Sequence, residues 1–162
     1  MAHTAAPATQ HLAAPRPAAD DSLLWSDARK LGYAPLDATH REFYTVVLHL
    51  LACDAATAAA ALAAFEAHAV AHFGQEEAWM RDTAFPAGGC HADEHAAVLA
   101  SVHEVQALLA DGRAGPPLLH SLAEHLLAWF PGHADHMDSA LAGWMVKRSH
   151  GGAPVVLRRR GG

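Results

Sequence analysis

Cysteine, aromatic residues and positive charge are all scarce in this chain of 162 residues. The two cysteines, Cys53 and Cys90, cannot build a disulfide scaffold, which favours a reducing compartment. Lys and Arg total 11 against 17 Asp and Glu, so the formal charge of −6 gives no global electrostatic reason to bind nucleic acid. The same charge argues against an anionic membrane surface as a partner.

Long apolar runs and targeting signals are also lacking. No stretch approaches the roughly 18 continuous apolar residues of a membrane span, so no membrane insertion is expected. The first 20 residues have neither the basic start nor the compact Leu/Val-rich run of a secretory signal. Their Ala, Pro and Thr content predicts a flexible leader over residues 1–22. We therefore expect a cytoplasmic protein, with a second flexible, basic tail over residues 149–162.

Apolar residues, and alanine in particular, are what the sequence has in quantity. They make up 52% of the chain, enough for one globular domain, which we place at residues 23–148. Alanine favours helix because it loses no side-chain entropy there. Apolar residues spaced three and four apart predict four helices. These begin near Pro35, after a possible N-cap at Asp54, near Cys90 and near Leu118.

Short connections between the predicted helices favour antiparallel neighbours. The predicted fold class is therefore all-α, an up-down-up-down antiparallel four-helix bundle with flexible N- and C-terminal tails. The last helix, over roughly residues 118–148, contains Pro131 followed by Gly132. Because Pro131 cannot donate a hydrogen bond to the carbonyl of Leu127, we expect a kink or an interruption at this point.

Histidine is the unusual component, with 14 residues in the chain. Neutral imidazole is a common metal ligand, so this number raises the question of a metal site. Side chains four residues apart lie on one face of a helix and can meet one metal ion. Three local patterns have spacings of four or five residues: His72 with Glu76, His91 with His95, and His133 with Asp138.

Each of these patterns alone is weak. In a chain so rich in histidine, about one His-x-x-x-His pair is expected by chance, and His68 with His72 forms another. The plain alternative is a histidine-rich bundle with fortuitous spacings. Order and separation favour the metal site, because each of these patterns falls on a different predicted helix and His40 lies on the remaining one.

The patterns, taken in order, resemble the hemerythrin signature. The matching segments are His40 within LGYAPLDATHREF, HFGQEEAWM at 72–80, HADEH at 91–95 and WFPGHADHMD at 129–138. In that family the order is His, His-x-x-x-Glu, His-x-x-x-His and His-x-x-x-x-Asp. The resemblance covers roughly residues 24–146 and is greatest to the single-domain bacterial hemerythrins, whose entry into the first helix is similar to Trp25, Gly32-Tyr33 and Leu36-Asp37.

The resemblance implies a non-haem centre of two iron ions inside the bundle. Position by position, His91, His95 and His133 would hold one iron, which is coordinatively saturated. His40 and His72 would hold the other iron and leave one position open. In the family, dioxygen binds reversibly at that open position while both irons pass from ferrous to ferric.

The resemblance further implies that Glu76 and Asp138 bridge the two irons, together with an oxo or hydroxo group derived from solvent. A mixed set of imidazole and carboxylate ligands is one that iron accepts without any thiolate. Reversible oxygen binding also needs water and protons kept out. The aromatic residues near the ligands in sequence are candidates for that dry wall: Phe43, Phe73, Trp79, Trp129 and Phe130.

The other histidines receive a plainer interpretation as surface or boundary residues: His49, His68, His103, His120, His125 and His136. Of these, His68 and His136 lie close enough to ligands in sequence to be partners of a ligand. The Arg158-Arg159-Arg160 run is interpreted as a solvated tail.

Three functions fit such a site. The first is reversible oxygen binding as a carrier, store or local supplier, with an oxygen-consuming client enzyme as the candidate partner. The second is a di-iron redox enzyme acting on peroxide or nitric oxide, and the third is an oxygen or iron sensor acting through a partner. Ferritin-like di-iron oxidases use paired Glu-x-x-His motifs, and no Glu in this chain is followed three residues later by His. We therefore expect an oxygen-binding protein rather than an enzyme, with incidental oxidase or peroxidase activity left open.

Overall fold

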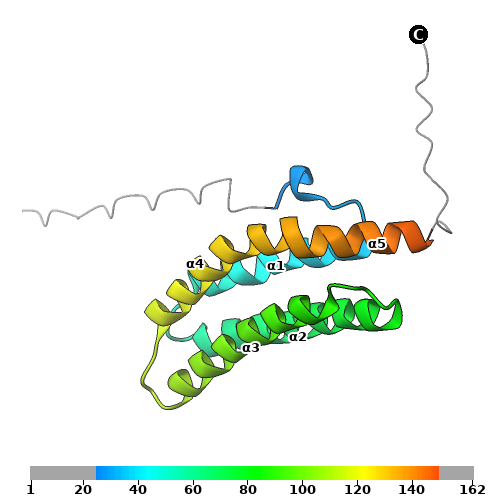
Figure 1. Ribbon diagram of the computed structural model, residues 1–162. Coiled ribbons are helices and arrows are strands. Elements are labelled where there is room, and N and C mark those ends of the chain that lie inside the picture. Colours follow the sequence, from blue (N-terminus) through cyan, green and yellow to red (C-terminus); the bar gives the residue numbers. More distant parts are fainter. Residues whose placement is uncertain (1–24, 150–162) are drawn as a thin grey trace, which may run out of the picture.

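The computed structural model describes residues 25–149, which form a bundle of helices (Figure 1). A short 3-10 helix, Asp27–Arg29, precedes α1 (Ala34–Ala52), α2 (Ala58–Asp82) and α3 (Gly88–Ala110). The fourth rod of the bundle consists of α4 (Pro116–His133), a π-helical turn (Ala134–Asp138) and α5 (Ser139–Ser149). The predicted leader and tail lie outside the described residues, apart from Ser149.

The all-α, four-helix prediction is confirmed. Helix α1 packs against both α2 and α4, and α2 packs against α3. Figure 1 shows α1 alongside α4 and α5, with α2 and α3 forming the second layer. The backbones of α3 and α4 approach each other less closely than those of the other three neighbouring pairs. Side chains therefore make most of the connection between these two helices.

The carboxylate of Asp37 is one of the contacts that attach the segment before α1. Asp37, in the first turn of α1, accepts hydrogen bonds from the backbone N–H groups of Leu31 at 2.6 Å and Gly32 at 3.2 Å. Gly32 has a φ of +83°, which a residue with a side chain rarely adopts. Pro35 occupies the start of α1, where a missing N–H costs nothing. Together these features direct the chain back across α1.

Asp54 acts one turn earlier than a helix cap. Its carboxylate accepts the N–H groups of Ala56 and Thr57, and α2 begins at Ala58. Asp54 therefore stabilises the turn between α1 and α2, whereas the sequence suggested it as the N-cap of the helix itself. The helix still begins within a few residues of the expected position.

The main hydrophobic core extends from the α1–α2 turn, near Cys53 and Ala58, to Phe73 and Phe130 beside the histidine cluster. Its fully buried large side chains come from all the long helices except α3, which contributes the smaller Val102 and Val105. The large aromatic and aliphatic members include Phe43, Leu50, Leu62, Phe65, Phe73, Leu119 and Phe130. Hydrophobic burial on this scale is the main stabilising term for a bundle of this size.

The expected interruption is wrong in position, because the helix does not end at Pro131, while the kink expected there stays a prediction. Pro131 lies inside α4, which continues to His133, and a π-helical turn follows at Ala134–Asp138. The N–H of Ser139 bonds to the carbonyl of Ala134, the i→i+5 pattern of a π turn. The irregularity of this rod is therefore the one wide turn directly after α4, and α5 begins at the next residue. None of the helices within residues 25–149 has the length and apolar character to cross a membrane.

Candidate metal centre

Seven side chains from all four rods of the bundle meet at its centre, and all are buried. They fall into two overlapping groups whose nitrogen and oxygen atoms lie within 4.8 Å of one another. The larger group contains Glu76, His91, His95, His133 and Asp138. The smaller group contains His40, His72 and Glu76. These are the seven residues singled out in the sequence, and the structure brings every one of them into the same site.

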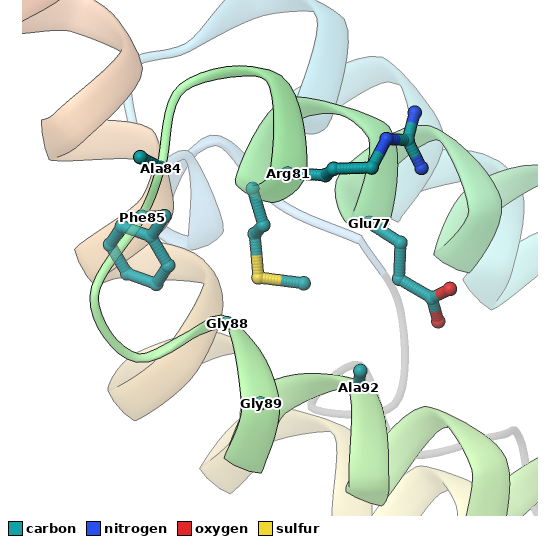
Figure 2. Close-up of a pocket in the computed structure, with 8 residues that line it drawn as sticks. Glu77, Arg81, Ala84, Phe85, Gly88, Gly89 and Ala92 are labelled. Carbon is teal, nitrogen blue, oxygen red and sulfur yellow. The ribbon is translucent and has the colours of Figure 1, made fainter.

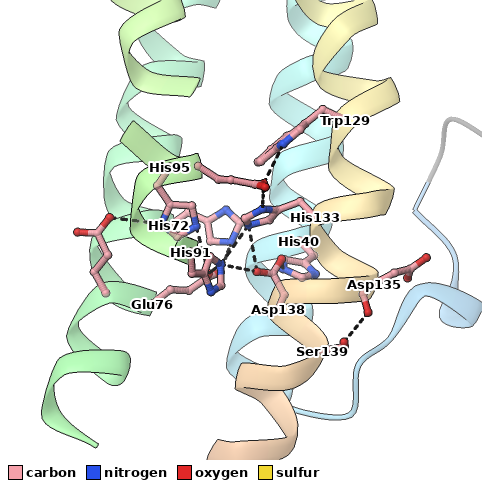
Figure 3. A network of polar contacts seen from close by, with 12 residues as sticks. His40, His72, Glu76, His91, His95, Trp129, His133, Asp135, Asp138 and Ser139 are labelled. Atoms are coloured by element: carbon pink, nitrogen blue, oxygen red, sulfur yellow. Dashed lines mark hydrogen bonds and ion pairs between the residues drawn. The ribbon is translucent and has the colours of Figure 1, made fainter. Parts of the chain in front are cut away.

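Each carboxylate divides its two oxygens between the two histidine groups (Figure 3). Oε1 of Glu76 lies 2.6 Å from Nε2 of His72, while Oε2 lies 3.1 Å from Nε2 of His91 and 3.5 Å from Nε2 of His95. Glu76 therefore faces two imidazoles of the three-histidine group with one oxygen and His72 with the other.

Asp138 is arranged in the same way from the opposite rod. Its Oδ2 lies 3.0 Å from Nε2 of His40. Its Oδ1 lies 3.0 Å from Nε2 of His91 and 3.2 Å from Nε2 of His133. Both carboxylates thus span the gap between a pair of histidines and a trio, as bridging ligands of two ions would.

The donor set fits metal ions better than it fits hydrogen bonding. Apart from the imidazole–carboxylate contacts just given, both oxygens of Glu76 and of Asp138 are buried without a hydrogen-bond partner, as is Nε2 of His40, His72 and His95. Buried polar atoms are normally hydrogen-bonded, because an unpaired one costs about 1–3 kcal/mol. So many unpaired lone pairs converging on one space are the pattern expected of atoms whose partner is a cation.

Electrostatics within the cluster keep both carboxylates ionised. Burial acts to raise the pKa of Glu76, but its close contacts with His72, His91 and His95 outweigh burial and hold the pKa well below the usual range. Burial likewise opposes the contacts of Asp138 with His133, His40 and His91, and the contacts again lower its pKa strongly. The site therefore offers two anionic ligands at neutral pH.

In the metal-free protein, the same contacts favour protonated imidazole. Burial acts to lower the pKa of His91, but the contacts with Asp138 and Glu76 raise it to about 9. The pKa of His133 is also raised, by Asp138 and then Glu94, against the effect of burial. A metal ion would displace these protons, because only neutral imidazole can be a ligand.

Aromatic rings line part of the two-histidine side of the site. Phe130 meets His40 edge-on with ring centroids 4.9 Å apart and stacks on Phe43 at 3.9 Å. On the three-histidine side, Phe73 stacks on His95 at 4.0 Å. Four of the five aromatic residues expected near the ligands therefore do contact the cluster or its wall, the fourth being Trp129.

Trp129 contacts one of the seven residues of the cluster, whereas Trp79 packs away from them. The ring of Trp129 lies against His133 with centroids 4.4 Å apart. The ring of Trp79 instead meets Tyr33 edge-on at 5.2 Å, so it packs against the segment before α1. Because α4 continues through Pro131, Trp129 does lie one turn before His133 on the same face.

Two acidic residues that the sequence analysis did not single out contact the outer nitrogens of the histidines. Glu94 lies with Oε2 2.9 Å from Nδ1 of His133, and Glu77 lies with Oε1 3.3 Å from Nδ1 of His95. Glu77 also borders a surface pocket of about 440 Å³ at the α2–α3 turn (Figure 2). Their only signal in the sequence was adjacency, since each stands next to a predicted ligand.

The other histidines within residues 25–149 lie outside the cluster. His49, His103, His125 and His136 are exposed, as expected. His68 is half-buried and packs beside His72 and Phe43. Burial, followed by the nearby His72 and His40 rings, lowers the pKa of His68 to about 4, so it is neutral at pH 7.

A cavity of about 200 Å³ leads from the surface to the two-histidine side. It reaches His40 and is bordered by the 3-10 segment, α1 and the end of α4. Its lining residues include Trp25, Ala28, Arg29, Tyr44, Phe130 and Asp135. Arg29 donates a hydrogen bond of 2.9 Å to the Tyr44 hydroxyl, which ties the 3-10 segment to α1 beside this cavity.

The fold and the site together define a helical bundle that carries a buried histidine and carboxylate cluster able to hold metal ions. The sequence pattern of the Hemerythrin HHE cation binding domain matches residues 31–145. The chain belongs to the hemerythrin family. It is also 40% identical over 124 residues to a bacteriohemerythrin from Ralstonia nicotianae, an alignment that covers 76% of this chain and 89% of that protein.

Proposed function

We propose that the cluster holds two non-haem iron ions and that the protein binds dioxygen reversibly. His91, His95 and His133 would hold one iron, and His40 and His72 the other. Glu76 and Asp138 would bridge them, with an oxo or hydroxo group as the third bridge. The observation that carries this proposal is the division of each carboxylate's oxygens between the two histidine groups.

The charge balance of the site supports two divalent ions. Two ferrous ions would bring four positive charges, which the two carboxylates and one hydroxide would reduce to about one. A residual charge of that size is tolerable in a buried site, whereas two ions without the carboxylates would be very costly. When bound, the iron pair supplies an open coordination position and the two electrons that reversible oxygen binding requires.

The apolar surroundings support reversible binding over turnover. His40 and His72 offer two ligands where the other group offers three, so the open position falls on their side of the cluster. Phe43 and Phe130 pack there, and neither brings a group that can donate or accept a proton. Exclusion of water and protons protects bound oxygen from release as peroxide.

The cavity that reaches His40 is the proposed route for dioxygen. It joins the surface to the two-histidine side, where His40 is one of its lining residues. Phe130, Trp25 and Arg29 are among its lining residues, and the Trp25 ring meets His40 edge-on with centroids 6.4 Å apart. A route of this kind sets the rates of oxygen entry and escape without changing the chemistry at the site.

In this proposal the protein is an oxygen carrier, store or local supplier rather than an enzyme. We expect it in the cytoplasm, where it would supply an oxygen-consuming client. Turnover of peroxide or nitric oxide, or an oxygen-dependent partner, would instead identify the redox enzyme or the sensor. These outcomes are distinguishable, because a carrier shows saturable uptake and release without consumption of a reductant.

Iron counts in matched variants test the ligand assignment. We expect two irons per chain in the unaltered protein, at most one in Glu76→Ala and loss of iron in His91→Ala. Glu66→Ala is the control, because Glu66 is a carboxylate on the same helix that contacts His103 and Gln106 away from the cluster. Two irons in either of the first two variants, by elemental analysis, would overturn the assignment.

A further inference from the structure

The three histidines of the larger group differ from His40 and His72 in which residues contact their outer Nδ1 atoms. We propose that Glu94 and Glu77 are positioning residues that make the three-histidine iron the tighter-binding and more readily oxidised ion of the pair. They would act through His133 and His95 without touching either metal. The inference rests on the proposed di-iron site and assigns to each iron a different outer environment.

Glu94 makes two contacts across the gap between α3 and α4. Its Oε2 lies 2.9 Å from Nδ1 of His133 and accepts a hydrogen bond of 3.3 Å from Nε1 of Trp129. Since Trp129 also lies against the face of the His133 ring, the imidazole is held by a ring on one face and a carboxylate at its edge. The backbones of α3 and α4 approach less closely than those of the other neighbouring helix pairs, so side-chain contacts such as these connect the two helices.

Glu77 does the same for His95 from α2. Its Oε1 lies 3.3 Å from Nδ1 of His95, and Phe73 stacks on the His95 ring with an interplanar angle of 6°. Both carboxylates therefore face the Nδ1 atom of a histidine whose Nε2 points into the cluster. A carboxylate at Nδ1 requires that nitrogen to carry the proton, which leaves the Nε2 lone pair free for a metal.

The two-histidine side has no such support. Nδ1 of His40 and Nδ1 of His72 are buried without a hydrogen-bond partner. Nδ1 of His91 is also unpartnered, so the contrast is two supported histidines out of three against none out of two. Nothing among the described residues compensates for this difference on the side of the open position.

The physical consequence is an inequality between the two irons. A carboxylate hydrogen-bonded to the outer nitrogen makes imidazole a stronger donor, and a stronger donor stabilises the more highly charged ion. The three-histidine position should therefore fill first and favour the ferric state. The side chains of Glu94 and Glu77 are 42% and 43% exposed, so solvent screens their charges and the effect is graded rather than absolute.

Replacing each carboxylate by its amide tests the proposal with little change in shape. Glu94→Gln and Glu77→Gln retain an oxygen that can accept from Nδ1 but remove the negative charge. Glu66→Gln is the matched control, because Glu66 contacts His103 on the neighbouring helix and no member of the cluster. The far-ultraviolet circular dichroism and melting temperature of the metal-free proteins establish that all four fold alike.

The readouts are the midpoint reduction potential of the iron-loaded protein and the stepwise binding of Co²⁺ to chelator-stripped protein. We expect a higher midpoint potential in Glu94→Gln and Glu77→Gln, and a first Co²⁺ bound about tenfold or more weakly. Glu66→Gln should match the unaltered protein in both. The proposal would be overturned if both Glu94→Gln and Glu77→Gln left the midpoint potential and the affinity for the first Co²⁺ unchanged.

These measurements distinguish failure of the di-iron proposal from failure of the role given to Glu94 and Glu77. If the unaltered protein held fewer than two metal ions per chain, the di-iron proposal itself would be wrong. If it held two and the amide variants behaved like the control, only the role of Glu94 and Glu77 would be wrong. A change in the second Co²⁺ alone would also overturn it, because the proposal places both carboxylates behind the first site.

Discussion

Asp138 faces His133 across a spacing that an α-helix would not allow. The two are five residues apart, yet Oδ1 of Asp138 lies 3.2 Å from Nε2 of His133. Five residues of α-helix would place two side chains about 140° apart around the axis. The π turn at Ala134–Asp138 widens this part of the rod and returns Asp138 to the face of His133.

Because the π turn sets the position of Asp138, inserting one residue there and deleting one should affect iron binding differently. Inserting one Ala after His136, which is exposed, should rotate Asp138 away from the cluster by about 100°. We expect at most one iron per chain in this variant. Deleting His136 should give a regular α-helix with the two residues four apart, so the carboxylate keeps its face and both irons are retained.

Elemental analysis of both variants, with helix content checked by circular dichroism, makes this comparison. Equal iron content in the insertion and the deletion would contradict the role assigned to the π turn. His103→Ala is the control for removing an exposed histidine, and it should retain both irons.

Phe130 separates the two-histidine side from the core, and its truncation should affect stability and oxidation together. Phe130→Ala removes a ring that stacks on Phe43 and meets His40 edge-on. Loss of a buried phenyl ring typically costs about 3–5 kcal/mol, measured here by denaturant unfolding. We also expect faster conversion of the oxygenated protein to the ferric form, because water can enter the space.

Phe65→Leu provides a comparison, since Phe65 is equally buried and contacts Phe43 but no ligand. It should lower stability without accelerating oxidation. Equal rates of oxidation in Phe130→Ala and Phe65→Leu would contradict the role of Phe130 in excluding water.

Filling the cavity beside His40 should slow oxygen exchange in both directions. Ala28 is an exposed residue that lines it, and Ala28→Trp would occupy much of the 200 Å³. Flash photolysis or rapid mixing should then show association and dissociation slowed by the same factor, with oxygen affinity unchanged. A change confined to one rate, or none, would contradict the proposed route. Ala64→Trp, in a separate groove at the end of α1, is the control.

The metal-free protein should lose stability as the pH rises above neutrality. The pKa of His91 is raised from its ordinary 6.5 to about 9 in the folded protein. A raised pKa contributes stability that is fully present below pH 6.5 and is lost as the pH approaches 9. The melting temperature of chelator-stripped protein should therefore fall across this window.

Iron-loaded protein should not show this loss in the same window, because the metal replaces the proton on the imidazole. His91→Gln should flatten the dependence in the metal-free protein, whereas His103→Gln, a change at an exposed histidine, should leave it intact. A melting temperature that held steady or rose between pH 6.5 and pH 9 would contradict the assignment to His91.

Much of the site was predictable because its residues follow helical spacing. His72 with Glu76 and His91 with His95 are four apart, and this alone places each pair on one face. The position of His133 relative to Asp138 was not predictable in detail, since an α-helix was assumed and a π turn is present. Pro131 lies in the rod that carries the irregularity, but the irregularity is the π turn after His133 and not an interruption at Pro131 itself.

The residues that surround the ligands were harder to identify. Glu94 approaches His133 only because α3 and α4 pack side by side, and no local pattern encodes a contact between two helices. Tyr44 was not singled out from the sequence, although it is buried with its hydroxyl bonded to Arg29. Phe43 and Phe73 were predicted correctly because each is close in sequence to a ligand on its own helix.

The most direct test of the central claim is a visible spectrum of anaerobically reduced protein, recorded again in air and then after flushing with argon, beside an iron count. The account predicts a nearly colourless reduced form that gains colour in air and loses it under argon, with two irons per chain. Colour that persisted under argon would contradict reversible binding and point to oxidation of the irons. Absence of both iron and colour would contradict the metal centre itself.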